Sequence, residues 1–209
     1  MSEMNKKIEN PFQDKKVAAA YDSFYDTDLG EIYDRLEKDA ILSLVDKKGG
    51  DLLEFGSGTG HWSDFFAKIG FNVIGVEISD AMLEVARVKK FDNVQFIKGD
   101  VEKIDLGQKF DVVAILTALE FLNNPKIAVE NAIKHLKPGG IIIIGVLNQD
   151  SELGRSRKQS EAITPYSFAK FYTKDELQLL FEKYGEVELK YCTLNGDNFF
   201  IAGRIDVGL

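Results

Sequence analysis

Gly56, Gly58 and Gly60 follow a short apolar run that ends near Glu54. Because glycine has no Cβ, a turn of this kind lets the backbone approach a ligand closely and adopt positive φ angles. Glu77 ends the next apolar run along the chain. If both runs are neighbouring parallel strands, their carboxyl ends meet at one edge of a sheet. The spacing therefore predicts a crevice in which a glycine loop and a carboxylate contact one small ligand.

Apolar runs typical of buried strands recur along the chain and are separated by segments with a helical period. They cover residues 51–55, 71–76, 94–98, 110–116 and 140–147. This alternation predicts a parallel sheet with helices on both faces, because the crossovers between parallel strands are right-handed. Ligands are then expected where the carboxyl ends of the first strands diverge.

The segments between the strands carry signals for helix starts and stops. Ser79 precedes an apolar run with helical period, which is typical of an N-cap. Pro125 opens a further helical segment, and the Pro-Gly-Gly sequence at 138–140 is expected to stop it. Thr173 and Glu176 have the spacing of a capping box before another helix.

The last quarter of the chain has a different pattern. Residues 187–191 and 198–202 are strand-like, and Asn195-Gly196 between them favours a hairpin turn. We therefore expect a doubly wound α/β fold whose mostly parallel sheet ends in a C-terminal antiparallel hairpin. The polar stretch 148–165 is expected to be a helical or loop excursion over the carboxyl edge of the sheet.

Composition limits the class of protein. The 209 residues are 44% hydrophobic, which is enough for one sizeable core, so we expect a single domain over residues 1–209. A net charge of −8 repels nucleic acid and anionic lipid. No run of 18 apolar residues predicts a membrane span, and no Cys or His spacing predicts a metal site. The single cysteine, Cys192, fits a reducing compartment, so we expect a cytoplasmic protein.

The order of these motifs resembles the class I methyltransferases that use S-adenosylmethionine (SAM). Five segments carry the resemblance, in chain order: residues 54–60, 76–79, 99–102, 110–113 and 136–140. It extends over roughly residues 17–204 and implies a Rossmann-like methyltransferase fold with a seven-stranded sheet. SAM is then the expected cofactor, and S-adenosylhomocysteine (SAH) the expected product.

Within that family the chain looks most similar to the small-molecule branch typified by ubiquinone and menaquinone methyltransferases. Residues 20–26 resemble the N-terminal lid of these enzymes, in which an aromatic side chain often touches the cofactor, and we assign the lid to residues 1–30. Ser57 stands where many relatives have cysteine, a change that the loop geometry should tolerate. Tyr21, with its aromatic neighbours, can close over SAM or pack as core.

The resemblance assigns a role to each part of the cofactor crevice. Glu77 is expected to accept hydrogen bonds from both ribose hydroxyls, because a carboxylate forms strong charge-assisted bonds. Asp100 and the Val101 amide would meet the adenine, and the glycine loop with Glu54 would meet the amino acid part. The full set of expected cofactor-binding residues is Tyr21, Glu54, Gly56, Ser57, Gly58, Gly60, Glu77, Ile78, Asp100, Val101 and Thr117.

The methyl acceptor is expected beyond Thr117, at the end of the fourth strand. Glu120 lies near this mouth, where its carboxylate could act as a catalytic residue that takes a proton or holds an amine, or could only cap the following helix. No Asn-Pro-Pro-aromatic motif stands there, which argues against methylation of adenine or glutamine amino groups. Arg155, Arg157 and Lys158 could attract an acidic acceptor or form a solvated face.

The sequence therefore predicts an enzyme that moves a methyl group from SAM to a small molecule by in-line displacement. A non-catalytic SAM-binding module is one alternative. An NAD-dependent dehydrogenase is a second, but its fingerprint needs a glycine three positions after Gly58, where His61 stands. The acceptor atom and the oligomeric state stay open.

Overall fold

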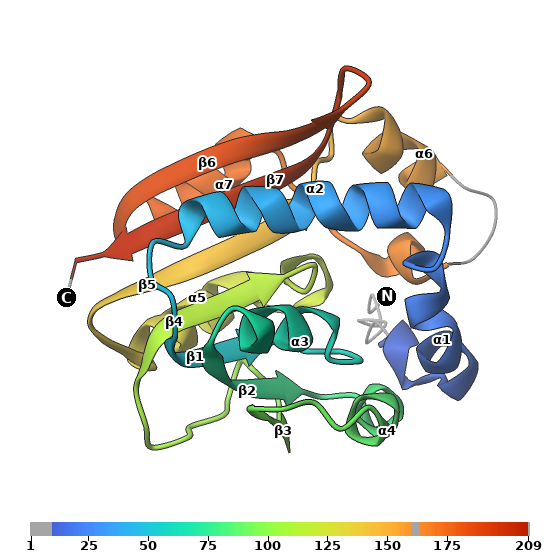
Figure 1. Ribbon diagram of the computed structural model, residues 1–209. Coiled ribbons are helices and arrows are strands. Elements are labelled where there is room, and N and C mark those ends of the chain that lie inside the picture. The colour runs from blue at the N-terminus through green and yellow to red at the C-terminus, as the bar shows by residue number, and fades with distance from the viewer. Residues whose placement is uncertain (1–9, 160–163, 209) are drawn as a thin grey trace, which may run out of the picture.

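The sheet of the protein has seven strands in the order β3-β2-β1-β4-β5-β7-β6 (Figure 1). This computed structural model describes residues 10–159 and 164–208. The strands are β1 (Gly50–Phe55), β2 (Phe71–Glu77), β3 (Val94–Lys98), β4 (Phe110–Leu116), β5 (Leu136–Leu147), β6 (Gly185–Leu194) and β7 (Asp197–Val207). The doubly wound α/β fold predicted from the sequence is confirmed.

The first five strands are parallel, and the last two are antiparallel to their neighbours. β1 lies between β2 and β4, so the strand order reverses beside it. Ligands of open α/β sheets bind at such a point, outside the carboxyl ends of the strands. The topology therefore places the glycine loop, which follows β1, where a ligand site is expected.

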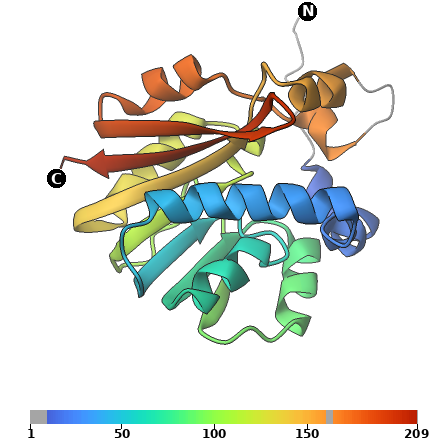
Figure 2. The same ribbon diagram turned by 45° about the horizontal axis from the view of Figure 1, so that its top comes forward.

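Helices cover both faces of the sheet (Figures 1 and 2). The α-helices are α1 (Lys15–Ala20), α2 (Asp28–Leu44), α3 (His61–Lys68), α4 (Asp80–Val88), α5 (Pro125–Lys134), α6 (Glu152–Gln159) and α7 (Lys174–Phe181). Side chains of α2 and α3 share one apolar cluster with one face of the sheet, and those of α5 and α7 share another cluster with the opposite face. The central strands are buried on both sides, which explains their unbroken apolar runs.

The C-terminal hairpin forms as its turn sequence predicts. Asn195 and Gly196 have φ angles of 51° and 87°. Positive φ at both central residues defines the turn that suits the twist of paired strands, and Asn-Gly adopts it readily. β7 then pairs antiparallel with β5, which joins the hairpin to the sheet.

The predicted helix caps are also present. The Ser79 hydroxyl accepts a hydrogen bond from the Met82 amide at 3.1 Å. Thr173 and Glu176 form a reciprocal capping box, in which each side chain accepts from the backbone amide of the other. These local contacts fix where α4 and α7 begin.

Two boundaries differ from the sequence prediction. β5 begins at Leu136, ahead of the Pro-Gly-Gly sequence, because Leu136 pairs with Phe110 across a register shift. The 17-residue helix α2 was not identified from the sequence, although it lies along one face of the sheet (Figures 1 and 2). Its four buried positions, Gly30, Glu37, Ile41 and Leu44, include a glycine and a glutamate, which interrupt the apolar pattern.

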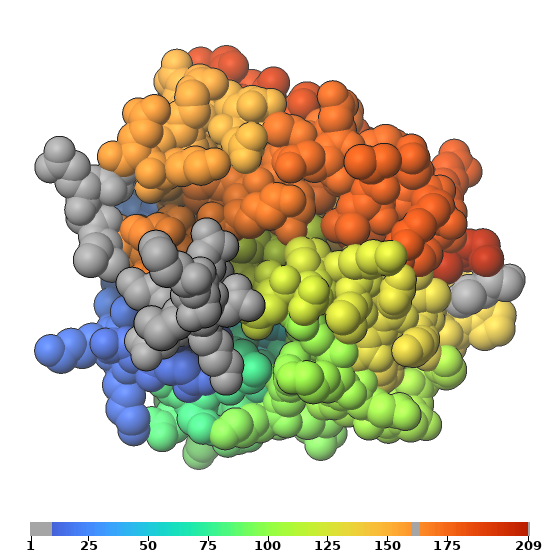
Figure 3. Space-filling model, turned by 180° about the vertical axis from the view of Figure 1, so that it is seen from behind, coloured from blue at the N-terminus to red at the C-terminus, as the bar shows by residue number. Residues whose placement is uncertain are grey.

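The N-terminal segment before α2 packs over the carboxyl edge of the sheet. It contains the short 3₁₀ helices η1 (Pro11–Gln13) and η2 (Tyr21–Phe24) on either side of α1. Seen from the face of α5 and α7, this segment in blue borders the green surface of α4 (Figure 3). Ala18 of α1 is buried against Ala81 and Met82 of α4. In the part of the chain that the structure describes, no helix combines the length and apolarity needed to cross a membrane.

We predict that Ile144→Ala lowers the free energy of unfolding by about 2–5 kcal/mol, because Ile144 is fully buried in the central strand β5 and truncation leaves a cavity. Leu179→Ala on α7, which is 72% exposed, is the control and should change stability by less than about 0.5 kcal/mol. Chemical denaturation of both variants measures the difference. Equal effects would contradict the assignment of β5 to the core.

Candidate functional site

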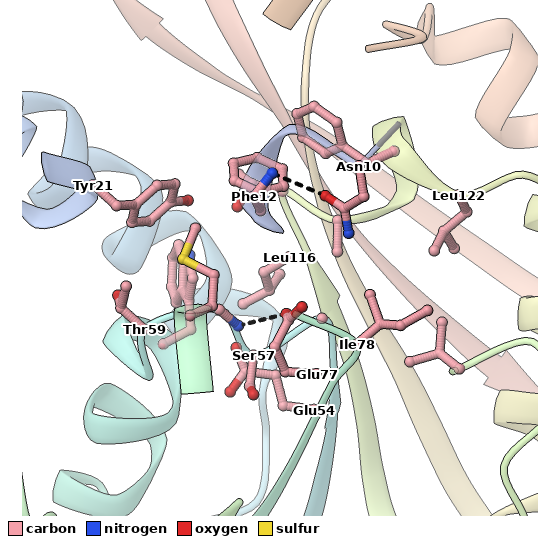
Figure 4. Close-up of a pocket in the computed structure, with 18 of the residues that line it drawn as sticks. Asn10, Phe12, Tyr21, Glu54, Ser57, Thr59, Glu77, Ile78, Leu116 and Leu122 are labelled. Carbon is pink, nitrogen blue, oxygen red and sulfur yellow. Dashed lines mark hydrogen bonds between the residues drawn. The ribbon is translucent and has the colours of Figure 1, made fainter. Parts of the chain in front are cut away.

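A cavity of about 170 Å³ opens at the carboxyl ends of β1, β2 and β4. Figure 4 shows Tyr21 and Phe12 of the N-terminal segment across the cavity from the strand ends that carry Glu54, Ser57 and Glu77. Ten of the residues predicted to bind a cofactor line it: Tyr21, Glu54, Gly56, Ser57, Gly58, Glu77, Ile78, Asp100, Val101 and Thr117. The fold thus brings together residues that lie far apart in the sequence.

The glycine loop depends on close backbone approach at Gly56. Its φ is 76°, and a Cβ there would lie 2.5 Å from the Cβ of Ala118. Gly58 also has positive φ, but a Cβ there would meet nothing within 4 Å, because this residue faces the cavity. Gly60 does not line the cavity; a Cβ there would meet the rings of Phe91 and Phe96, so Gly60 serves packing rather than ligand contact.

Glu77 connects the glycine loop to the start of α4. Its Oε2 accepts a hydrogen bond from the Gly58 amide at 3.0 Å, which Figure 4 draws, and its Oε1 accepts from the Ser79 amide at 2.7 Å. The side chain is only 7% exposed, and burial raises its pKa while these amide bonds partly offset the shift. Because a carboxylate has about four acceptor positions, Glu77 can accept further bonds from a ligand.

Glu54 is the most deeply buried carboxyl of the cavity, at 1% exposed. Its Oε2 accepts a hydrogen bond from the Ser63 hydroxyl, which ties the end of β1 to α3. Burial raises the pKa of Glu54 from 4.5 to about 8, and the Ser63 hydrogen bond partly opposes this. A carboxyl that titrates near neutral pH inside a cleft is typical of functional sites.

Asp100 follows β3 and lines the cavity. Its Oδ1 accepts a hydrogen bond from the Glu102 amide at 3.0 Å, and its Oδ2 lies 2.6 Å from the Lys103 ammonium. Both contacts are local, so they fix the orientation of this carboxylate relative to the Val101 amide next to it. Asp100 and Glu77 line the same cavity from neighbouring strands, as the sequence predicts.

Thr117 has a left-handed backbone with φ of 48°, although it is β-branched. This conformation is costly for such a residue and persists only where the surroundings impose it, often at ligand sites. The Thr117 amide donates to the Gly145 carbonyl at 2.7 Å, which holds the strained turn at the end of β4. Thr117 lies at the boundary between this cavity and a second one.

The second cavity, of about 330 Å³, adjoins the first at Phe12, Tyr21, Tyr25 and Thr117. Its remaining walls come from α1, η2, α2, β5, α6 and η4 (Pro165–Phe168). It is lined by Phe12, Val17, Ala20, Tyr21, Phe24, Tyr25, Tyr33, Glu37, Thr117, Leu147, Leu153, Arg157, Pro165 and Tyr166. Aromatic rings are therefore prominent in the walls of this chamber. The sequence analysis identified only some of its lining residues, among them Tyr21, Thr117 and Arg157.

Glu37 is the residue of this chamber that sequence reasoning missed. It is 8% exposed, and burial raises its pKa from 4.5 to about 8, with the nearby Asp34 adding to the shift. A signal was available, because Glu37 lies four residues after Tyr33 and four before Ile41 on the apolar stripe of α2. A charged residue inside such a stripe indicates a special environment.

His61 has a defined position that the sequence did not reveal. Its Nε2 lies 2.6 Å from Asp34 Oδ1, and its ring stacks on Tyr25 with centroids 3.8 Å apart. Asp22 of the same N-terminal segment accepts a hydrogen bond from the Thr59 hydroxyl at 2.7 Å and pairs with Lys89. These contacts seat the N-terminal segment on the glycine loop.

Glu120 lies outside the lining of both cavities. Its Oε1 accepts a hydrogen bond from the Leu147 amide at 2.9 Å, whereas its Oε2 is buried without a partner. Burial raises its pKa from 4.5 to about 7, and the Leu147 amide partly opposes the shift. Leu147 lines the second cavity, so Glu120 is separated from this cavity by one residue. The catalytic role predicted for Glu120 stays a prediction.

The basic residues 155, 157 and 158 separate in the structure. Arg155 and Lys158 are exposed, whereas Arg157 lines the second cavity. Among the described residues, no three His, Cys, Asp or Glu side chains gather closely enough to hold a metal ion.

Comparison with known proteins gives a consistent result. A family model described as a methyltransferase domain matches residues 21–186. An uncharacterized protein of Methanocaldococcus jannaschii is 36% identical over 84% of this chain and 81% of its own length. The ubiquinone/menaquinone biosynthesis C-methyltransferase UbiE of Pseudomonas putida is 29% identical over 80% of this chain and 67% of its own length. The crystal structure of a SAM-dependent methyltransferase from Thermotoga maritima matches with a TM-score of 0.77 and 25% identity, over 95% of this chain and 99% of that one.

We predict that Glu54→Gln flattens the dependence of stability on pH. In the unfolded chain Glu54 loses its proton near pH 4.5, and in the folded protein near pH 8, so the folded state holds more protons between these values. The free energy of unfolding contributed by this residue therefore falls as pH rises through this window. Relative to wild type, the variant should gain up to a few kcal/mol between pH 5 and 8.

Urea denaturation across this pH range measures the effect. Glu182→Gln is the control, because Glu182 is exposed at the end of α7. Its free energy of unfolding should follow that of wild type across the pH range. A difference for Glu54→Gln that stays constant with pH would count against a buried, protonated carboxyl.

Proposed function

Because the chain belongs to the methyltransferase domain family, we propose that it transfers the methyl group of SAM to a small organic acceptor and releases SAH. The observation that carries the proposal is the pair of adjoining cavities at the carboxyl edge of the sheet. The first is lined by the glycine loop and its carboxylates, and the second by aromatic rings. They meet at Tyr21 and Thr117, so a donor and an acceptor can face each other there.

The polar groups of the first cavity fit SAM. Ser57 Oγ and Trp62 Nε1 are buried without hydrogen-bond partners, although both residues line the cavity. Buried polar atoms are rarely left unpaired, so a polar ligand is expected to satisfy them. The open space beside Gly58 would be filled by any side chain there, which supports close contact between the backbone and a ligand.

Each part of the cofactor has a proposed partner. Glu77 would accept hydrogen bonds from the ribose hydroxyls while it keeps its two amide donors. Asp100 and the Val101 amide would hold the adenine, next to the partly exposed Ile78. Glu54, Ser57 and the backbone of Gly56 and Gly58 are left for the amino acid part. Tyr21 and Thr117 stand at the mouth of the second cavity.

The chemistry requires positioning more than covalent help. SAM supplies an electrophilic methyl group: an acceptor lone pair forms the new bond to the methyl carbon, and the carbon–sulfur bond breaks with its electron pair on sulfur. The residues of this chain hold both reactants in line and exclude water, which can supply several kcal/mol. Phe12, Tyr21 and Tyr25 provide an apolar wall where the cavities join.

The N-terminal segment is proposed to act as the lid over this site, within a single catalytic domain of residues 1–209. Residues 1–9 of the predicted lid lie outside the described residues. Of the rest, Phe12 packs edge-on against Phe121 with ring centroids 4.8 Å apart, and the Phe12 carbonyl accepts from the Ser79 hydroxyl at 2.6 Å. This seating supports a lid that must open for exchange of ligands. The single buried cysteine fits a reducing compartment, which supports a cytoplasmic location.

Glu77→Gln should weaken the binding of SAH by about ten- to hundredfold, because it removes the charge from hydrogen bonds to the ribose and replaces one acceptor of the Gly58 and Ser79 amides by a donor. Titration calorimetry measures this, with Asp80→Asn as the control, since Asp80 is exposed and next to the same turn. The control should bind SAH like wild type. NAD is titrated in parallel, and a protein that bound NAD but not SAH would be a dehydrogenase rather than a methyltransferase.

Glu120→Gln should reduce turnover more than it reduces SAM affinity. Glutamine keeps an acceptor for the Leu147 amide, so the fold should persist, but it cannot take a proton. If Glu120 accepts a proton, the dependence of turnover on pH near 7 disappears in the variant. SAH release from SAM with a pool of metabolites gives the rate, and its absence in wild type would indicate the non-catalytic binding module. Parallel losses of turnover and affinity, or no loss at all, would argue against catalysis by Glu120.

A further inference from the structure

Arg157 extends from α6 into the second cavity and lies among aromatic rings. Its guanidinium carbon is 3.9 Å from the ring centroid of Tyr166 and 5.7 Å from that of Phe24. Its Nη1 is buried and has no hydrogen-bond partner. Within residues 10–159 and 164–208, no carboxylate lies within ion-pair distance of it, although Glu37 lines the same cavity. Among the side chains that the structure describes, Arg157 is therefore a cation without an ion-paired anion, and it lines a chamber of ligand size.

Arg157 is half-buried, and its side chain hydrogen-bonds to that of Tyr166. Its Nη1, however, is buried without an acceptor, which is costly because the desolvation of a charged donor is then not repaid by a hydrogen bond. Its planar fork matches the two oxygens of a carboxylate. The rings of Tyr166 and Phe24 hold the guanidinium in place, so it is oriented before a ligand arrives. An anionic group on a ligand would supply the acceptor that Nη1 of Arg157 lacks.

Two buried carboxyls, Glu37 and Glu120, interact electrostatically with Arg157, which lowers the pKa of both. Burial acts in the opposite direction and raises these pKa values to about 8 and about 7, which weakens the negative charge near Arg157 at neutral pH. Burial also raises the pKa values of the tyrosines that line the chamber, Tyr21, Tyr25, Tyr33 and Tyr166, which keeps them neutral. Arg157 is then the dominant fixed charge of the chamber.

The chamber separates this charge from the site of methyl transfer. Arg157, Glu37 and Tyr166 line only the second cavity, whereas Tyr21 and Thr117 line both. The other walls are apolar and come from side chains such as Val17, Leu147 and Leu153. A volume of about 330 Å³ suits a small organic molecule with a ring-sized body.

An amine acceptor fits this chamber less well. Aromatic rings beside a carboxyl can bind an organic cation. Here, however, the chain's own guanidinium already stacks on Tyr166, so a second cation would meet a like charge. The arrangement favours a negatively charged ligand.

We propose that the methyl acceptor is an organic acid with an apolar, ring-sized body, whose carboxylate binds Arg157 while its reacting atom lies beside Tyr21 and Thr117. The inference rests on the proposed function, because it assumes that the second cavity receives the acceptor. Arg157 is then a specificity-determining residue that selects acids at the end of the chamber away from the methyl group.

Three probes with the same ring and different charge test the proposal: phenylacetate, phenylacetamide, which has nearly the same shape as phenylacetate, and the smaller cation benzylamine. Each is titrated by calorimetry into the protein saturated with SAH. Wild type should bind phenylacetate about ten- to hundredfold more tightly than phenylacetamide, and benzylamine most weakly. Arg157→Gln should abolish this preference, whereas Arg157→Lys should keep part of it, since lysine keeps the charge but loses the fork.

Arg155→Gln is the matched control, because Arg155 lies on the same helix but is exposed and lines neither cavity. It should keep the full preference for phenylacetate. SAH affinity, measured first, should be equal in all four proteins and shows that each variant is folded. Loss of SAH binding in wild type would overturn the proposed function itself.

With SAH bound, three results would overturn only the proposal on Arg157. These are a preference for benzylamine, a preference for phenylacetate that persists in Arg157→Gln, and no binding of phenylacetate at about 10 mM. The first would assign the chamber to amines, with Glu37 as the anionic partner.

Discussion

At the end of β2, the carboxylate of Glu77 accepts amide hydrogen bonds from Gly58 of the glycine loop and from Ser79 at the start of α4. The Gly58 bond holds the loop after β1 against the end of β2, and the Ser79 bond orients the start of α4, so the first cavity has a rigid floor. They depend in turn on Gly56, since any side chain there would collide with Ala118 and displace the loop. Without this contact, the residues proposed to bind the cofactor would have no fixed frame.

The second cavity is built differently, from elements that contact one another only in the folded chain. The N-terminal segment, α2, α6 and η4 supply its walls, and the strained Thr117 turn at the end of β4 joins it to the first cavity. In such an arrangement the rigid edge of the parallel sheet forms the cofactor site, and the elements packed above it determine which acceptor can bind. In this chain those elements contribute aromatic rings, Glu37 and Arg157.

Three buried carboxyls, Glu37, Glu54 and Glu120, surround the two cavities, and burial raises the pKa of each toward or above neutrality. Burial of an ionisable group costs stability, and a fold does not need three such groups for its core. All three carboxyls lie near one edge of the sheet. Such clustering is expected at a functional site, where ionisable groups with shifted pKa values are retained although their burial lowers stability. The apolar core lies on the two faces of the sheet, where side chains of β1, β4 and β5 pack against the helices.

Features that arise from neighbouring residues were predictable from residue order alone: the strand runs, the glycine loop, the Ser79 and Thr173 caps and the Asn195-Gly196 turn. Backbone conformation and helix capping depend on contacts between residues a few positions apart. The residue types that favour them can therefore be recognised in the sequence. In contrast, the folded chain was needed to see that Glu37 and Arg157, 120 positions apart, share one chamber, and that Gly60 and Glu120 line neither cavity. Packing between distant elements sets which side chains face a cavity and how strongly burial shifts their pKa values. No local sequence pattern encodes this packing.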